Sequence, residues 1–141
     1  RRVDFSQVPL FVEGCDEPTT QELERVARTL SRRVYRASSA QRREVHLTGV
    51  LACNFVNALY AMAADRLGEH ADLPFDVLRP LIEETARKAA EAEHPRRVQT
   101  GPAVRGDFSV AERHEAMLRT EREKEIYKLL TEYIWETSKR I

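Results

Sequence analysis

Residues 46–60 form an apolar stretch with the spacing of a helix, and polar side chains interrupt it. The polar members are His46, Cys53, Asn54 and Asn57, and we call them the polar seam. A histidine can transfer protons near neutral pH, and a side-chain amide can hydrogen-bond to polar ligand atoms. Burying such a group without a partner costs a few kcal/mol, so we expect each one to be satisfied. At about 100° per residue, His46, Cys53 and Asn57 fall within about 60° of one another.

Two interpretations of the polar seam stay open on the residues alone. In one, His46, Asn54 and Asn57 contact a ligand. In the other, they are core polar groups that bond to neighbouring backbone or across a subunit boundary. Direct activation of the Cys53 thiol by His46 is excluded, because seven residues of helix separate the two by roughly 10 Å. We therefore expect Cys53 to serve in packing.

A second unusual stretch is the loop QTGPAVRGD, residues 99–107. Its glycines permit a left-handed backbone and a close approach to a ligand, and Arg105 offers a planar fork suited to a carboxylate or phosphate. The alternative is an ordinary turn between helices. In that case Asp107 or Ser109 caps the next helix and Arg105 pairs with a nearby acid.

Several chemistries are disfavoured by what the sequence lacks. Its five glycines build neither a dinucleotide-binding motif nor a P-loop. The four histidines and two cysteines are dispersed, so we expect no metal site, and the cysteine usage fits a reducing cytoplasm. Basic and acidic residues balance at 23 each, which argues against nucleic acid. Three scattered arginine pairs, Arg32-Arg33, Arg42-Arg43 and Arg96-Arg97, are interpreted as solvated surface, with a phosphate site as the alternative. Without a long uncharged apolar window, we also expect no membrane span.

Four capping boxes predict where helices begin, each a hydroxyl followed three residues later by Glu or Gln. They are Thr19/Glu22, Ser38/Gln41, Ser109/Glu112 and Thr120/Glu123. The first predicts a helix over about residues 20–31, between β-prone runs at 9–13 and 33–37. Residues 8–38 are therefore predicted as strand, helix, strand with parallel strands, at the edge of a larger sheet.

The second capping box predicts the longest helix, over about residues 39–67 and ended by Gly68. Another helix is predicted within residues 73–94, kinked or restarted by Pro80. We predict residues 95–107 to be a structured loop too short for a helix, followed by helices at about 110–119 and 121–139. The last carries an apolar stripe of Ile126, Leu129, Leu130, Tyr133, Ile134 and Thr137.

These elements predict a mostly α fold, a helical bundle around one long central helix, preceded by a short β-α-β unit. With 141 residues, 42% of them hydrophobic, the chain has the size of one domain and can bury a core. The chain begins at Arg1 without an initiator methionine, so we expect a piece of a longer protein.

Four blocks of the sequence, taken together, resemble domain-of-unknown-function family 2520. They are QRREVHLTGVLACNFVNALYAMA, LPFDVLRPLIEETARK, QTGPAVRGD and IYKLLTE. In that family the domain is the C-terminal half of a Rossmann-type, NAD(P)-dependent oxidoreductase-like protein. It is similar in architecture to the helical second domains of 6-phosphogluconate dehydrogenase and pyrroline-5-carboxylate reductase relatives.

The resemblance implies a division of the chain, a cofactor and a partner. Residues 1–38 would be the last strand, helix and strand of a truncated Rossmann-like domain. Residues 39–141 would be an all-helical domain that closes the substrate cleft and dimerises. NAD or NADP would be bound mainly by the missing N-terminal half, so we expect this chain alone to be inactive. The complete protein is expected to be a homodimer that acts on a small molecule with an anionic group.

The resemblance also implies that the polar seam and the 99–107 loop face one cleft between domains. His46 would handle the proton, because the long helix contains no lysine for that role. Asn54 and Asn57 would hold substrate or nicotinamide atoms. Thr100 and Arg105 would bind an anionic group. The alternative is a non-enzymatic dimerisation or ligand-binding module, in which the two asparagines hydrogen-bond across a two-fold interface.

Overall fold

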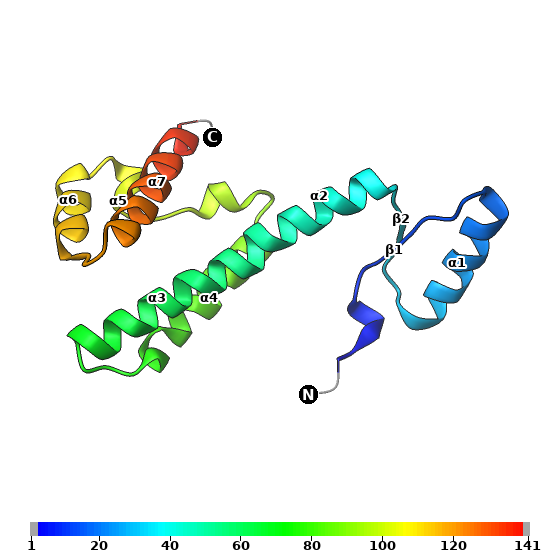
Figure 1. Ribbon diagram of the computed structural model, residues 1–141, viewed down its shortest axis with the longest axis horizontal. Helices are drawn as coiled ribbons and strands as arrows, with labels where there is room; N and C mark the ends of the chain where they lie inside the picture. Colours follow the sequence, from blue (N-terminus) through cyan, green and yellow to red (C-terminus); the bar gives the residue numbers. More distant parts are fainter. Residues whose placement is uncertain (1–2, 140–141) are drawn as a thin grey trace. The chain divides into compact units, whose positions relative to one another are not determined.

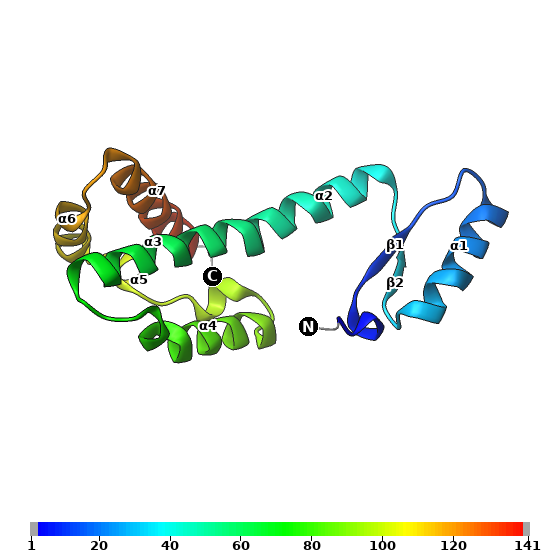
Figure 2. The same ribbon diagram turned by 60° about the horizontal axis from the view of Figure 1, so that its bottom comes forward.

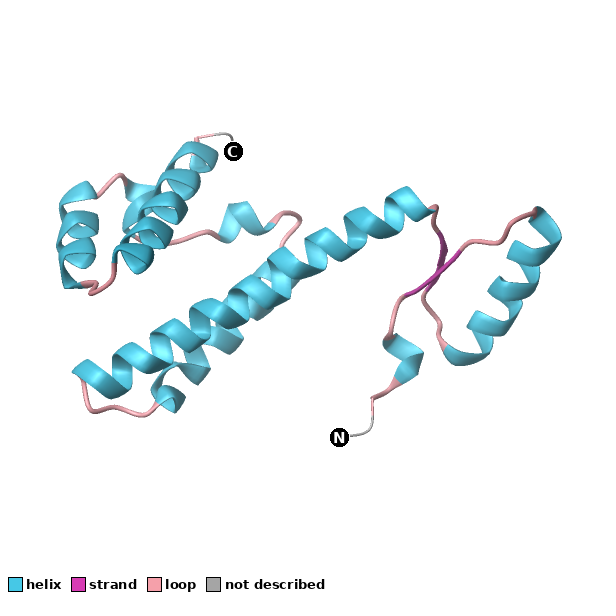
Figure 3. Ribbon diagram, viewed as in Figure 1, coloured by secondary structure: helices cyan, strands magenta, loops and turns pink. Residues whose placement is uncertain are grey.

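A computed structural model describes residues 3–139 of the protein, which divides into two compact units. Unit 1 extends to Pro74, and unit 2 begins at Phe75. The mostly α fold with a short β-α-β unit, predicted from the sequence, is confirmed (Figure 3). The domain boundary predicted between residues 38 and 39 stays a prediction, because the division of this chain into two compact units does not test it.

Unit 1 begins with a 3-10 turn, Phe5–Gln7, and a strand-helix-strand unit of β1 (Leu10–Val12), α1 (Glu17–Leu30) and β2 (Val34–Arg36). The two strands pair in parallel, with Leu10 opposite Val34 and Val12 opposite Arg36 (Figure 1). Both the strands and their parallel direction match the sequence prediction. On this sheet Phe11 stacks on Tyr35, with ring centroids 5.6 Å apart.

Helix α1 begins three residues before the position that the first capping box predicts. Asp16 is the N-cap residue, and its carboxylate accepts a hydrogen bond from the Thr19 backbone N–H at 2.8 Å. Pro18 fits the first turn, where a missing N–H costs nothing. Thr19 therefore lies inside the helix, and the prediction that it caps α1 is wrong because Asp16 competes for the same role.

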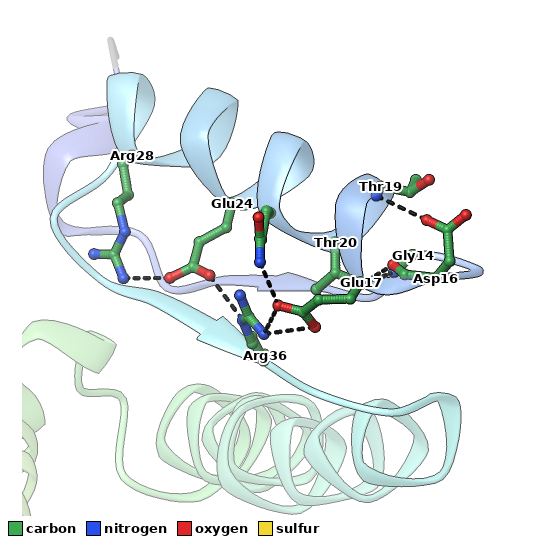
Figure 4. Close-up of polar contacts among 9 residues, drawn as sticks. Gly14, Asp16, Glu17, Thr19, Thr20, Glu24, Arg28 and Arg36 are labelled. Carbon is green, nitrogen blue, oxygen red and sulfur yellow. Dashed lines mark hydrogen bonds and ion pairs between the residues drawn. The ribbon is translucent and has the colours of Figure 1, made fainter.

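Arg36 of β2 holds the sheet to α1 through carboxylates (Figure 4). It donates to Glu24 at 2.8 Å and to Glu17 at 2.9 Å, while Arg28 donates to Glu24 from the next turn of the helix. In the same strand-helix-strand unit, Ser31 is almost fully buried and its hydroxyl donates to the Val8 carbonyl. The strand-helix-strand unit is thus held mainly by polar contacts around a very small buried core.

The chain leaves β2 through a continuous helical rod made of three segments (Figures 1 and 2). These are α2 (Ser39–Gly49), a π-helical turn η2 (Val50–Asn54) and α3 (Phe55–His70). The predicted capping box of Ser38 and Gln41 is present at its start. The predicted stop at Gly68 is wrong, because the helix continues to His70 and ends where Asp72 adopts a positive φ of 49°.

This rod, Ser39–His70, is long and apolar enough to cross a membrane by length and composition, with a mean hydropathy of 1.5 in the qualifying window. That finding differs from the sequence analysis, which required a window free of polar residues. One such helix is weak evidence, since the core helix of a soluble protein passes the same test. The absence of a membrane span stays a prediction.

Unit 2 opens with a 3-10 turn, η3 (Phe75–Leu78), that leads directly into α4 (Arg79–Glu91). Pro80 lies in the first turn of α4, so the predicted restart of the helix at this proline is confirmed. A second 3-10 turn follows, η4 (Pro95–Val98), and His94 caps it through Nδ1, which accepts from the Arg96 N–H at 3.1 Å.

The rest of unit 2 contains α5 (Pro102–Arg105), α6 (Phe108–Met117) and α7 (Glu121–Ser138). The prediction that residues 95–107 hold no helix is wrong, because Pro102 starts a single helical turn there. Asp107 caps α6, so the predicted Ser109 box is also wrong, and the Ser109 hydroxyl donates to Asp107 instead. The predicted box of Thr120 and Glu123 is present at the start of α7.

Aromatic contacts join α5, α6 and α7. Gly106, with φ 68°, lies under the indole of Trp135, where an added Cβ would come within 2.8 Å of the ring. Phe108 meets the same indole edge to face, with centroids 5.3 Å apart. His114 and Tyr127 form a hydrogen bond of 2.9 Å between α6 and α7. The predicted stripe of α7 is only partly covered, since Leu129 is 65% exposed and Thr137 is buried.

Candidate functional site

The polar seam lies along the helical rod of unit 1. His46 belongs to the last turn of α2, Asn54 is the last residue of the π turn, and Asn57 follows in α3. All of them are exposed, as is Cys53, and the structure shows no buried residue in the rod. The structure therefore does not place these polar groups in a core. Among residues 3–139, the His46 imidazole has no hydrogen-bond partner.

The π turn changes which asparagine shares a face with His46. A regular α-helix would place Asn57 about 20° and Asn54 about 80° from His46 around the axis. Each π-helical residue turns the chain by roughly 85° instead of 100°, so Asn54 comes to about 20° and Asn57 moves to about 55° on the other side. The π turn thus brings Asn54 closer to the face of His46 and moves Asn57 to its other side, and both amides stay within about 60° of His46. Single π turns inside helices occur frequently at functional sites.

The spacing along the rod limits what these two side chains can bind. His46 and Asn54 are eight residues apart, which corresponds to roughly 12 Å along the axis. Two side chains at this distance cannot hold the same small functional group. They can contact two parts of an extended ligand, or two ligands that lie end to end.

A network of side chains ties the end of β1 to the first turn of α2. Glu13 accepts hydrogen bonds from the Ser39 hydroxyl and from Arg42, each at 2.7 Å. Arg42 also donates to the Ala37 carbonyl at 2.8 Å and to the Ser39 hydroxyl at 3.0 Å. The hydrogen bond from Ser39 and the charge and hydrogen bond of Arg42 hold the pKa of Glu13 below its ordinary value. The network fixes the helical turn that precedes His46.

An open hollow of about 420 Å³ lies beside this network, on the same side of α2 as His46. Ser39, Arg42, Arg43 and His46 line it. The sequence analysis interpreted the two arginines as solvated surface and missed this grouping. Their positions three and four residues before His46 are the signal that could have placed them beside it.

The other two predicted site residues belong to unit 2: Thr100 lies two residues before α5, and Arg105 is the last residue of that helix. Both are exposed, and Gly101 between them has a φ of 110°, a conformation that favours glycine. Asp107 caps α6, as the alternative interpretation of this loop predicts. The same interpretation predicts that Arg105 pairs with a nearby acid, but Arg105 has no acidic partner among residues 3–139. The two units hold different parts of the predicted site, and their meeting in one cleft stays a prediction.

No group of three His, Cys, Asp or Glu side chains suited to a metal ion occurs in the part of the chain that the structure describes. Cys15 and Cys53 are both free and exposed. The polar seam offers an accessible imidazole, two amides and a thiol, and the hollow beside His46 adds the guanidinium groups of Arg42 and Arg43.

Solved structures of other proteins resemble the chain. A crystal structure from Bacteroides fragilis, named a putative NADP oxidoreductase, is 46% identical with a TM-score of 0.88, over 96% of this chain and 52% of that protein. A crystal structure of a Thermotoga maritima protein is 21% identical with a TM-score of 0.74, over 89% of this chain and 51% of that protein, and shows the same fold. The chain thus spans about half the length of both relatives. No curated protein matches it.

The family comparison covers nearly the whole chain. Residues 8–134 match the model of the family described as Domain of unknown function (DUF2520). This range includes both strands, the helical rod with its polar seam, the 99–107 loop and most of α7. The chain belongs to the DUF2520 family.

Proposed function

We propose that this chain is the C-terminal substrate-cleft and dimerisation half of an NAD(P)-dependent oxidoreductase. The observation that carries the proposal is the likeness to the Bacteroides fragilis protein, because 46% identity extends over 96% of the chain. The parallel β1 and β2 agree with it, since two parallel strands need further strands and helices to cover them. We place the protein in the cytoplasm, with a small molecule as substrate.

The nicotinamide nucleotide would be held mainly by the half of the protein that precedes this chain. The chain has no glycine-rich turn for a pyrophosphate, whereas the carboxyl ends of its strands lead directly to Glu13 and Ser39. When bound, such a cofactor supplies or accepts a hydride. NADP is the first choice because of the name of the relative from Bacteroides fragilis.

His46 would exchange a proton with the substrate. Hydride transfer to a carbonyl or imine leaves an oxygen or nitrogen that must gain a proton, and the reverse reaction must remove one. His46 suits this task because its imidazole is exposed and uncommitted among the described residues. Asn54 would orient substrate or nicotinamide atoms about two turns further along the same face.

Asn57, Thr100 and Arg105 complete the proposed site. Asn57 is exposed, and the π turn moves it further than Asn54 from the face of His46. Arg105 would bind an anionic group of the substrate through its guanidinium fork, with Thr100 beside it. These assignments need the two units to meet around the substrate.

The proposal is tested in the complete protein, which contains this chain and the half that precedes it. NADPH binding is measured by fluorescence, and its oxidation is followed with small oxo acids, aldehydes and imines. We expect His46→Ala to lower kcat/KM by about 10²- to 10⁴-fold while NADPH affinity changes little. Unaltered turnover and unaltered NADPH affinity in this variant would overturn the catalytic role of His46.

The two asparagines provide a matched pair for the same assay. Both are exposed amides on one helical rod, and each is changed to alanine. Because the π turn brings Asn54 closer than Asn57 to the face of His46, we expect Asn54→Ala to weaken ligand binding by about tenfold and Asn57→Ala to have a smaller effect. A larger effect at Asn57 would show that the rod binds its ligand on another face.

A second candidate is a dimerisation module without catalysis. Leu47, Leu51 and Phe55 follow one another along the rod, and each is more than half exposed, at 52%, 52% and 56%. A row of this kind fits a packing surface for a second copy of the chain. Analytical ultracentrifugation of Asn57→Leu separates the two candidates, because loss of the dimer with NADPH binding intact favours packing.

A further inference from the structure

The hollow beside His46 combines charge with an accessible imidazole. Ser39, Arg42 and Arg43 line it together with His46, and all of these residues belong to unit 1. They recur at intervals of three and four residues along α2, so they share one side of the helix. The geometry of the hollow is therefore independent of unit 2.

The two arginines of this hollow have different roles. Arg42 is committed, since it donates to Glu13, to the Ala37 carbonyl and to the Ser39 hydroxyl. Arg43 is exposed and has no ion-pair partner among residues 3–139. Glu13 offsets the charge of Arg42, so the hollow keeps the positive charge of Arg43. Arg42, held in place by Glu13, and Arg43, whose guanidinium has no ion-pair partner among residues 3–139, together can form an anion-binding site.

The position of the hollow in the fold also indicates a ligand. Glu13 follows β1, and Ser39 begins α2 shortly after β2, so both lie at the carboxyl ends of the parallel strands. In open sheets of this kind, ligands bind outside the carboxyl ends of the strands. The hydrogen bonds between Glu13 and Arg42 hold the hollow next to the carboxyl ends of β1 and β2.

We propose that the hollow lined by Arg42, Arg43 and His46 binds an oxyanion, a phosphate or carboxylate group, next to the proposed reaction site. Arg43 supplies the charge and two parallel N–H donors. Arg42, fixed by Glu13, gives the hollow its shape. His46 also lines the hollow and donates an imidazole N–H to the anion. This inference rests on the proposed function only for the source of the anion, which is either a phosphate of the nucleotide or an acidic group of the substrate.

The test measures binding of inorganic phosphate to the complete protein by calorimetry, in the wild type and in Arg43→Gln. The matched control is Arg33→Gln, which removes the same charge from an exposed arginine at the opposite, amino end of β2. We expect Arg43→Gln to weaken phosphate binding at least about tenfold, whereas Arg33→Gln leaves it unchanged. Arg43→Lys should recover part of the affinity, since it restores charge without the fork.

Three results would overturn the inference. They are no phosphate binding to the wild-type protein, an unchanged affinity in Arg43→Gln, and equal losses in Arg43→Gln and Arg33→Gln, which would show a general effect of net charge. Thermal melting of each variant checks that the exposed substitutions leave the fold intact.

A second titration identifies the source of the anion. If saturating NADPH blocks phosphate binding and Arg43→Gln weakens NADPH as well, the hollow takes a phosphate of the nucleotide. If phosphate binds equally well with NADPH present, the hollow takes an acidic group of the substrate. A protein that binds phosphate through Arg43 but never binds NADPH would contradict the proposed function and leave the anion site standing.

Discussion

The start of α2 and the cluster of α5, α6 and α7 are held in place by different forces. At the start of α2, Glu13, Ser39 and Arg42 form charged and polar contacts at the surface. In the cluster, Gly106 and Phe108 pack against Trp135. Exposed ion pairs orient groups but add little stability, whereas close packing adds stability and tolerates no extra atom. Changes near His46 should therefore alter binding, and changes near Trp135 should alter folding.

The largest effect on stability is expected for Gly106→Ala. The alanine must adopt a φ of 68°, and its Cβ must displace the indole of Trp135. We expect a loss of about 1–3 kcal/mol in the free energy of unfolding, measured by urea denaturation. A loss below about 0.5 kcal/mol would show that this contact does not hold the cluster.

A smaller effect, of opposite sign, is expected for Gly49→Ala. Gly49 has helical backbone angles, and an added Cβ meets no atom within 4 Å. Alanine should raise the free energy of unfolding by about 0.5–1 kcal/mol, because glycine loses more backbone freedom on folding. The same denaturation assay checks it. Destabilisation would mean that the π turn after Gly49 depends on the glycine.

A still smaller effect on stability is expected for Arg42→Gln. The side chains of Arg42 and Glu13 keep 39% and 35% of their exposure, so solvent screens their ion pair. We expect the melting temperature to fall by less than it does in Gly106→Ala, while phosphate binding at the hollow weakens. A large fall in melting temperature with unchanged phosphate binding would reverse the roles assigned to the two regions.

The smallest effect is the pH dependence of the strand-helix-strand unit. Hydrogen bonds from Arg36 and Arg28 hold the pKa of Glu24 below its ordinary value of 4.5, and those from Gln21 and Arg36 do the same for Glu17. A lowered pKa in the folded state adds stability above the unfolded pKa, and this stability is lost as the pH falls through the folded pKa. Melting temperatures should thus decline below about pH 4.5, and decline less in Arg36→Gln. An equal decline in both proteins would contradict the assignment to Arg36.

Local signals explain how much of the fold could be predicted from the sequence. The parallel strands and the boxes at Ser38 and Thr120 depend on neighbouring residues, and the structure contains them. Two other boxes failed because Asp16 and Asp107 lie nearby and cap the same helices instead.

Two kinds of feature could not be predicted: those that depend on contacts between residues far apart in the sequence, and the choice between an α-helical and a π-helical turn. Nothing in the periodicity of residues 46–60 distinguishes a π turn from an α turn, yet this turn changes which asparagine lies nearer to the face of His46. Similarly, the sequence left open whether the glycines of residues 99–107 approach a ligand or form an ordinary turn, and the left-handed Gly106 lies under Trp135, 29 positions later in the sequence. The hollow beside His46 was missed because Arg43 alone carries no motif.

The central claim is that His46 and Asn54 form one wall of a nicotinamide-dependent reaction site. A crystal structure of the complete protein with NADP⁺ tests it most directly. The account predicts that the nicotinamide ring lies beside the face of the rod that carries His46 and Asn54, with at least one of them within about 4 Å of the ring. A ring bound away from this face, with His46 and Asn54 in contact with a second subunit, would contradict it.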